Sequence, residues 1–188
     1  TNSLSVSCVI SNHETLRELV EREGLKFHHI PVEQDSKAAA FDRMEQIWTE
    51  DAADLVVLAR YMQVVPSEFC SRWSGKIMNI HHSFLPSFVG ANPYRRAYQR
   101  GVKLIGATCH YATADLDEGP IIAQDCFHVR PNMTMKEIIA EGQRIERRPR
   151  RDPGELQSAV LRRQRMARQI LVDARGVGFE RRQCVGQT

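Results

Sequence analysis

Short apolar runs alternate with helical segments over the first 81 residues, and this pattern constrains the fold more than any other feature. The run from Leu55 to Ala59 is continuously apolar, which suits a strand that is buried on both faces of a parallel sheet. Alternation of strands with helices indicates βαβ units and therefore an α/β protein with a mostly parallel sheet and flanking helices. The expected strands are residues 4–10, 26–30, 54–59 and 76–81, and the expected helices are 14–23, 37–50 and 67–73.

The pattern changes after residue 81. Two further strands are predicted at 105–113 and 121–129, and the short acidic turn between them favours antiparallel pairing near the C-terminal end of the sheet. Helices are predicted at 94–100, 134–147 and 156–172, the second of them with Thr134 and Glu137 in capping-box spacing. We predict a catalytic domain over residues 1–148, followed by an atypical basic segment, 149–188, that is partly helical or disordered.

Charge is divided unevenly along the chain. Residues 1–148 carry 17 Lys and Arg against 19 Asp and Glu, whereas residues 149–188 carry nine Arg, no Lys and four acidic residues. The main body therefore gives no reason to expect a nucleic-acid partner. Apolar runs stay well short of the about 18 residues that a membrane span needs, and the first ten residues do not resemble a secretion signal. We accordingly expect no membrane partner and a cytoplasmic location.

The five cysteines include no C-x-x-C pair and no zinc-ligand spacing. We interpret them as free thiols in a reducing cytoplasm, and we predict neither a metal nor a prosthetic group. Several histidines are expected to be structural or exposed, namely His13, His28, His29, His110 and His128.

Three polar side chains stand out as candidates for chemistry. Asn79 and His81 alternate along the strand at 76–81, so they point to the same side, and Asp117 lies in the acidic turn. An amide donor can hold a developing oxyanion, an imidazole can pass a proton, and a carboxylate can orient the imidazole or a water molecule. These are the groups needed to move a carbonyl group.

The segment from Ile80 to Tyr94 resembles the folate-dependent formyltransferase fold family, and within it the formyltetrahydrofolate deformylases. Residues 10–13, 58–63, 101–108 and 114–122 carry the same likeness, which covers about residues 5–148. The resemblance implies a Rossmann-like formyltransferase fold and hydrolysis of the substrate 10-formyltetrahydrofolate to formate and tetrahydrofolate, in one-carbon and purine metabolism. It also implies that Asn79, His81 and Asp117 are catalytic, that no metal takes part, and that the Leu85–Pro86 bond is cis.

The resemblance further implies that two loops, 61–65 and 113–117, enclose the pterin ring of the folate. The predicted substrate-binding residues are Tyr61, Met62, Gln63, Val64, Val65, His82, Asn92, Thr113, Ala114, Asp115 and Leu116. For His82, a pocket-shaping role and a loop-fixing hydrogen bond both remain open, and His82 is expected to point away from His81 if the strand continues. Asn92 is either a pocket residue or the start of a helix.

The chain also departs from the family it resembles. An N-terminal regulatory domain of the ACT type and the first strand and helix of the catalytic domain are not recognised in it, and Pro149 begins an Arg-rich sequence where the family continues a long helix. We hypothesise a truncated or frame-shifted product, whose uncovered sheet edge or core face favours a homo-oligomer. Two alternatives remain open: a glycinamide ribonucleotide formyltransferase, and a non-catalytic folate-binding remnant.

Overall fold

The structure is a computed structural model that describes residues 5–87, 92–146 and 168–173. The described residues fall into two compact units, divided between Gln63 and Val64. The first unit also includes the C-terminal residues 168–173. Each unit has its own strands and helices, and each is described separately below.

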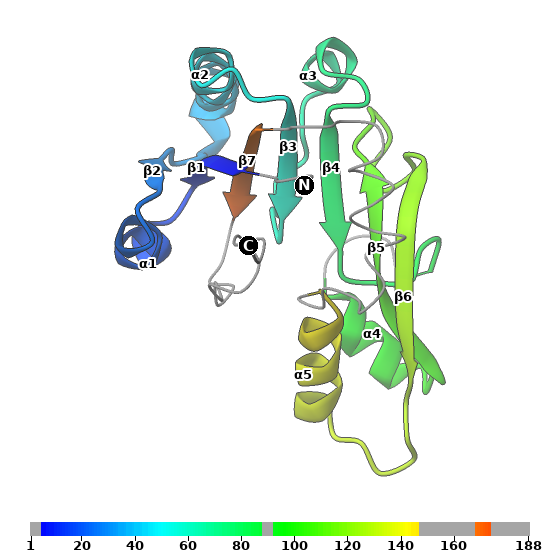
Figure 1. The fold of residues 1–188 in the computed structure, drawn as a ribbon. Coiled ribbons are helices and arrows are strands. Elements are labelled where there is room, and N and C mark those ends of the chain that lie inside the picture. The colour runs from blue at the N-terminus through cyan, green and yellow to red at the C-terminus, as the bar shows by residue number, and fades with distance from the viewer. Residues whose placement is uncertain (1–4, 88–91, 147–167, 174–188) are drawn as a thin grey trace. The chain divides into compact units, whose positions relative to one another are not determined.

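The first unit contains a parallel four-stranded arrangement in the order β2-β1-β7-β3 (Figure 1). Two helices, each preceded by a short 3-10 turn, lie on opposite faces of these strands (Figure 1). The chain runs from β1 to its neighbour β2 on one side and then returns past β1 to β3 on the other side. Both crossovers are right-handed, and because they run in opposite directions across the sheet, α1 and α2 lie on opposite faces. The elements are β1 (Ser5–Ser11), η1 (Glu14–Leu16), α1 (Arg17–Arg22), β2 (Lys26–His29), η2 (Gln34–Ser36), α2 (Lys37–Glu50), β3 (Leu55–Ala59) and β7 (Arg168–Asp173).

Side chains on β1 and β2 alternate between two environments. Val9 and Phe27 are cross-strand partners, and they form an apolar cluster with Val20 of α1. Cys8 and His28 belong to the opposite face, since successive side chains of a strand point to opposite sides. The long helix α2 buries the face that its periodicity predicts, which confirms that prediction: Phe41, Met44, Ile47 and Trp48 are buried, together with Ala40.

Strand β7 corrects one prediction. The helix predicted over 156–172 is wrong for residues 168–172, which form a strand; residues 156–167 lie outside the described part of the chain. The run Ile170-Leu171-Val172 is apolar and partly β-branched, which suits a strand between two parallel neighbours. In the structure Leu171 pairs with Val9 of β1 and Val57 of β3. Part of the basic segment is thus a sheet strand of the first unit, while the domain boundary at residue 148 stays a prediction.

The second unit contains an antiparallel arrangement in the order β4-β5-β6, which confirms the antiparallel pairing predicted for the last two strands. Helices α4 and α5 pack together over an apolar core of Tyr94, Ala97, Ile105 and Ile138. Thr134 and Glu137 form the predicted capping box before α5, with the Thr134 N–H donating to Glu137 Oε2 over 2.7 Å. The elements are α3 (Ser67–Arg72), β4 (Ile77–His81), α4 (Pro93–Gln99), β5 (Leu104–Tyr111), β6 (Ile121–His128) and α5 (Met135–Glu146).

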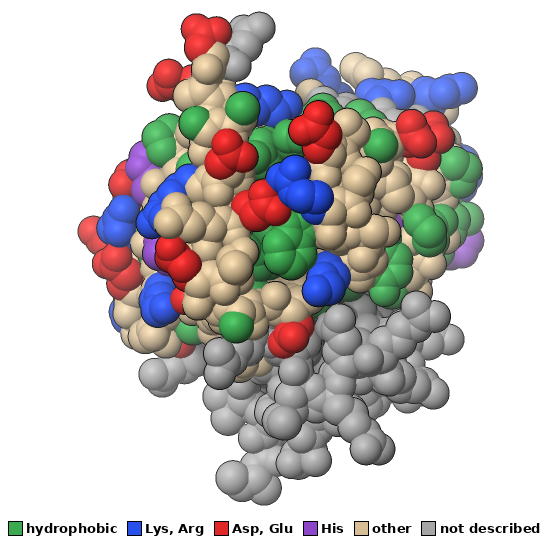
Figure 2. Space-filling view, turned by 90° about the horizontal axis from the view of Figure 1, so that it is seen from above, with side chains coloured by type: hydrophobic (Ala, Val, Ile, Leu, Met, Phe, Trp, Pro, Cys, Tyr) green, Lys and Arg blue, Asp and Glu red, His purple; other side chains and the backbone are tan. Residues whose placement is uncertain are grey.

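Acidic and basic side chains are interspersed over the face of the described residues that Figure 2 shows. This face therefore has no broad field of a single sign of the kind that steers a nucleic acid. Among the described residues, no helix is long and apolar enough to cross a membrane, and α2 is the longest with 14 residues.

Candidate active site

The second unit brings Asn79, His81 and Asp117 together. Asn79 and His81 lie two residues apart on β4, so they share one side of the strand, and Asp117 comes from the loop between β5 and β6. Asp117 Oδ1 lies 3.4 Å from Asn79 Nδ2 and 3.4 Å from His81 Nδ1. The side chains of His81 and Asp117 are only 7% and 5% exposed. One carboxylate oxygen is therefore shared by an amide and an imidazole away from bulk water.

A fourth side chain, His110, belongs to the same cluster. The sequence analysis expected His110 to be structural or exposed and did not include it in the site. Strands β4 and β5 are antiparallel with Asn79 directly opposite His110, which places both side chains on one face of the pair. His110 is 2% exposed, and its Nε2 lies 3.2 Å from Asn79 Nδ2 and 3.6 Å from Asp117 Oδ1. The place of His110 in the cluster depends on the register of β4 against β5, which local sequence patterns do not specify.

The hydrogen bonds of His110 determine how the Asn79 amide is oriented. His110 Nδ1 lies 2.9 Å from the carbonyl oxygen of Tyr111, which can only accept, so the proton is on Nδ1. In the neutral ring Nε2 is then an acceptor, and Asn79 must present its NH2 group rather than its carbonyl oxygen to it. The two N–H groups of Asn79 thus face His110 and Asp117, and the donor end of the amide lies inside the cluster.

The loop that carries Asp117 is held in an unusual backbone conformation. Asp117 has φ of 59°, in the left-handed region, which Asp tolerates better than most residues. A Cβ atom on Gly119 would overlap the carbonyl oxygen of Tyr111, so only glycine fits where the loop returns to β5. The N–H of Tyr111 donates to the carbonyl oxygen of Pro120 over 3.0 Å and closes the loop. These constraints turn the Asp117 carboxylate towards β4.

The chain that follows β4 is fixed by a buried threonine. Thr108 Oγ1 donates to the carbonyl oxygen of Ser83 over 2.8 Å and accepts the N–H of Leu85 over 3.1 Å. Gln124 Nε2 donates to the carbonyl oxygen of Leu85 over 2.9 Å and to Thr108 Oγ1 over 3.0 Å. The Leu85–Pro86 bond is cis, as the resemblance implied. The network sets where the chain goes immediately beyond His81.

His82 does not point away from His81 as the alternation of a continuing strand predicts. Strand β4 ends at His81, so the alternation ends there too, and the two imidazole rings lie with centroids 5.6 Å apart and planes 21° from parallel. His82 also contacts Tyr94, with ring centroids 5.9 Å apart. His82 and Tyr94 line a cavity of about 470 Å³ in the second unit. Asn79, His81 and Asp117 do not line this cavity. Asn92 occupies the N-cap position of α4.

The remaining predicted binding residues differ in exposure. Tyr61 is buried in the first unit, where its ring packs edge-on against Phe41 with centroids 6.4 Å apart. Burial raises the pKa of its hydroxyl group. Three apolar side chains of the two predicted folate loops are exposed to solvent, namely Met62, Val64 and Leu116. Gln63 and Val65 are half-buried, and Thr113, Ala114 and Asp115 are exposed. Exposed apolar side chains on loops are available to contact a ring of a ligand.

Comparison with known proteins gives a consistent set of relatives. Residues 1–149 match the family described as formyl transferase. A formyltetrahydrofolate deformylase of Bacillus subtilis is 50% identical over 142 residues, which are 76% of this chain and 47% of that protein. The crystal structure of a formyltetrahydrofolate deformylase from Pseudomonas syringae pv. tomato superposes with a TM-score of 0.73 at 44% identity, covering 82% of this chain and 50% of that chain.

A phosphoribosylglycinamide formyltransferase from Anaplasma phagocytophilum superposes with a TM-score of 0.67 at 35% identity, covering 74% of this chain and 66% of that chain. The identity to the transferase is therefore lower than the identity to either deformylase. The chain spans about half the length of the curated relatives it matches.

Proposed function

The chain belongs to the formyl transferase family, and on this premise we propose that it hydrolyses 10-formyltetrahydrofolate to formate and tetrahydrofolate. The observation that carries the proposal is the cluster in which Asn79 and His81 both lie 3.4 Å from one oxygen of Asp117. An amide donor, an imidazole and a carboxylate at this separation are the groups that acyl transfer to water requires. The proposed reaction consumes only the folate and water.

The first step in the proposed mechanism is attack of water on the formyl carbon. The carbonyl π electrons move onto the formyl oxygen, which becomes an oxyanion. We assign the stabilisation of this oxyanion to the Asn79 NH2 group, whose donor end the His110 contact holds in the cluster. The formyl oxygen replaces one of the two acceptors that Asn79 faces in the free chain. Loss of one such donor typically slows a reaction by about 10²–10³-fold.

The second step breaks the bond between the formyl carbon and N10. The nitrogen must gain a proton to leave as an amine, and His81 is placed to supply it. His81 directs Nδ1 to Asp117, so we assign the proton transfer to Nε2. The water molecule contributes its oxygen and one hydrogen to formic acid, which releases that proton to solvent and becomes formate, and the other proton of the water reaches N10 by way of His81. Atoms and charge therefore balance without a further reactant.

Asp117 has two roles in this proposal. Its carboxylate accepts from His81 Nδ1 and stabilises the imidazolium form of the ring, and it can also hold the attacking water. Its 5% side-chain exposure strengthens both interactions, since a charge pair is weakened less when little solvent surrounds it. The residues that contact the pterin ring stay a prediction, with loops 61–65 and 113–117 as the candidates.

Transfer of the formyl group to a purine precursor amine is the competing activity within the family. The observation relevant to it is His82, whose ring centroid lies 5.6 Å from that of His81 and 5.9 Å from that of Tyr94, and which lines the cavity in the second unit. We propose that this imidazole occupies space next to the catalytic ring that an incoming amine would need, so water is the preferred nucleophile. The percentage identities to the relatives point the same way.

A formate assay tests the proposal directly. The purified chain is incubated with 10-formyltetrahydrofolate, with and without glycinamide ribonucleotide, and both formate and formylated amine are quantified. Formate release at the same rate in both reactions supports hydrolysis. Product that forms only with the amine establishes transfer instead. Folate binding measured by calorimetry without any formate release establishes a non-catalytic folate-binding chain and refutes the proposed function.

A further inference from the structure

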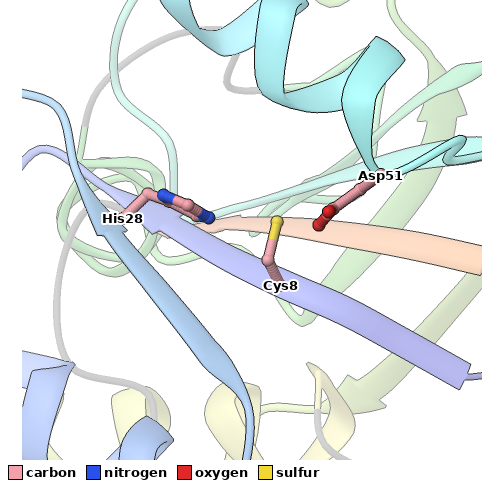
Figure 3. Close-up of side chains that lie close together, drawn as sticks. All are labelled: Cys8, His28 and Asp51. Carbon is pink, nitrogen blue, oxygen red and sulfur yellow. The ribbon is translucent and has the colours of Figure 1, made fainter.

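Three potential metal ligands lie together in the first unit, on residues that the proposed reaction does not use. Cys8 is on β1, His28 is on β2, and Asp51 follows the last residue of α2. One ligand atom from each residue lies within 4.8 Å of the other two. Figure 3 shows the Cys8 sulfur between the His28 ring on one side and the Asp51 carboxylate on the other.

The fold explains why these side chains meet. In the parallel pairing of β1 with β2, Cys8 is opposite Lys26 and Ile10 is opposite His28, so Cys8 and His28 are neighbours on one face. Helix α2 ends above this face (Figure 3). The N–H of Asp51 donates to the carbonyl oxygen of Ile47 over 2.9 Å. The cluster therefore rests on two sheet strands and a capped helix end, which are rigid supports for a site.

Two polar atoms of the cluster are buried without a hydrogen-bond partner among the described residues: His28 Nε2 and Asp51 Oδ2. Lys26 Nζ lies 2.7 Å from the other oxygen, Asp51 Oδ1, so the ion pair leaves Oδ2 for another partner. The Cys8 side chain is fully buried, and that of Asp51 is 12% exposed. The Cys8 thiol and the Asp51 carboxylate also interact through a side-chain hydrogen bond. Buried polar atoms are nearly always satisfied in folded proteins, so His28 Nε2 beside this pair requires an explanation.

We propose that Cys8, His28 and Asp51 bind one Zn²⁺ ion, with water as the fourth ligand. A sulfur, a nitrogen and an oxygen ligand suit zinc, and the sulfur and nitrogen disfavour the hard cations Mg²⁺ and Ca²⁺. Tetrahedral zinc with bonds of about 2.0–2.3 Å places its ligand atoms about 3.3–3.7 Å from one another. The observed separation of at most 4.8 Å closes to this range with side-chain movements of about 1 Å.

Electrostatics at the cluster are compatible with a cation. Burial lowers the pKa of His28, although Asp51 and Glu50 oppose the shift and Arg43 and Lys26 add to it. Burial, together with Asp51, raises the pKa of the Cys8 thiol to about 12. A bound Zn²⁺ reverses that preference and displaces the thiol proton into solution. The C-terminal end of α2 also favours a nearby positive charge.

Metal titration of the full chain tests the proposal. The purified, untagged chain is treated with a chelator, dialysed, and titrated with Zn²⁺ against a chromophoric competitor. One equivalent of tight binding is expected, with a rise in the thermal unfolding temperature because the ion binds only the folded site. Titration with Co²⁺ is expected to give an intense visible spectrum of a tetrahedral site and a thiolate-to-cobalt charge-transfer band. Absence of stoichiometric Zn²⁺ binding, or of the thiolate band, refutes the site.

Variants locate the bound ion. Cys8→Ser is expected to remove the charge-transfer band and to weaken Zn²⁺ binding by more than about 100-fold, the upper end of the loss typical for residues that only support a ligand. Cys126→Ser is the matched control, because that thiol is exposed and outside the cluster, and it is expected to bind as the wild type does. Should Cys8→Ser not fold, Asp51→Asn tests the same site at a partly exposed position. Wild-type affinity in a folded Cys8→Ser or Asp51→Asn variant refutes the proposal.

Discussion

Replacement of Asp117 by Asn removes one negative charge from the candidate active site and little else. The two side chains have the same shape, and Asn tolerates the left-handed conformation that Asp117 adopts, with φ of 59°. The fold of the loop is therefore expected to survive. The change is aimed at the interaction between Asp117 and His81, which the proposed mechanism needs when the ring is an imidazolium.

The size of the effect follows from the distance between the two groups. His81 Nδ1 lies 3.4 Å from Asp117 Oδ1, and two unit charges at this separation attract by about 5 kcal/mol at an effective dielectric constant of about 20. If the imidazolium forms in the rate-limiting step, its loss of stabilisation slows hydrolysis by about 10³–10⁴-fold, at about 1.4 kcal/mol per factor of ten. We expect the decrease mainly in kcat, since the charge pair matters in the transition state more than in substrate binding.

The assay is steady-state formate release by the wild type, Asp117→Asn and a control, with circular dichroism to compare their folds. Glu118→Gln is the matched control, because it removes a neighbouring carboxylate that is exposed and has no place in the site. The control is expected to stay within about twofold of the wild type, as surface substitutions usually do. A folded Asp117→Asn variant with a kcat within about tenfold of the wild type refutes the role given to Asp117.

Three further outcomes are expected. His110→Gln lowers kcat by about 10–100-fold with little change in KM, because the oxyanion donor loses the contact that orients it; unchanged kcat in a folded variant contradicts this. Gly119→Ala lowers kcat by about 100-fold, because its methyl group displaces the loop from Tyr111, and activity equal to the wild type argues against a loop held by that contact. Thr134→Ala lowers the free energy of unfolding by about 1 kcal/mol in urea titrations, because it removes the cap of α5. The Thr134 N–H, which the variant keeps, and the Thr134 hydroxyl, which it removes, both lower the pKa of Glu137. The stabilisation from the hydroxyl is full above the unfolded-state pKa of about 4.3 and is lost as pH falls through the folded-state value, so the difference in melting temperature between wild type and variant is expected to become smaller in acid, and a difference that does not change with pH contradicts this.

The local sequence pattern was sufficient to predict most helices and strands of the described residues. The periodicity of residues 37–50 predicts α2 and its buried face, and the apolar run ending at Ala59 predicts β3, because both depend on spacing within one segment. The helix predicted to end at Val172 is wrong in its last residues, because their conformation depends on contacts with distant segments. Its periodicity is weak, and pairing with β1 and β3 on both sides decides the conformation of Ile170 to Val172.

Some residues of the candidate site could also be predicted from the sequence, and others could not. Asn79 and His81 could be paired from the sequence because they alternate on one strand, and the family resemblance connected them to Asp117. His110 could not be found, because its place opposite Asn79 depends on the register between two strands. The orientation expected for His82 assumed that the strand continues beyond His81; β4 ends at His81, and that end is set by contacts of the following loop and not by local propensity.

The sequence by itself thus determined what short-range periodicity and recognisable motifs encode: the kind of most elements, the face that α2 buries, and the membership of residues 1–149 in a family. Only the tertiary structure decided which distant side chains meet, including Cys8 with His28 and Asp51 and the insertion of β7 between β1 and β3. The physical reason is that strand pairing and helix packing join residues far apart in the chain. Contacts of this kind leave no fixed spacing in the sequence.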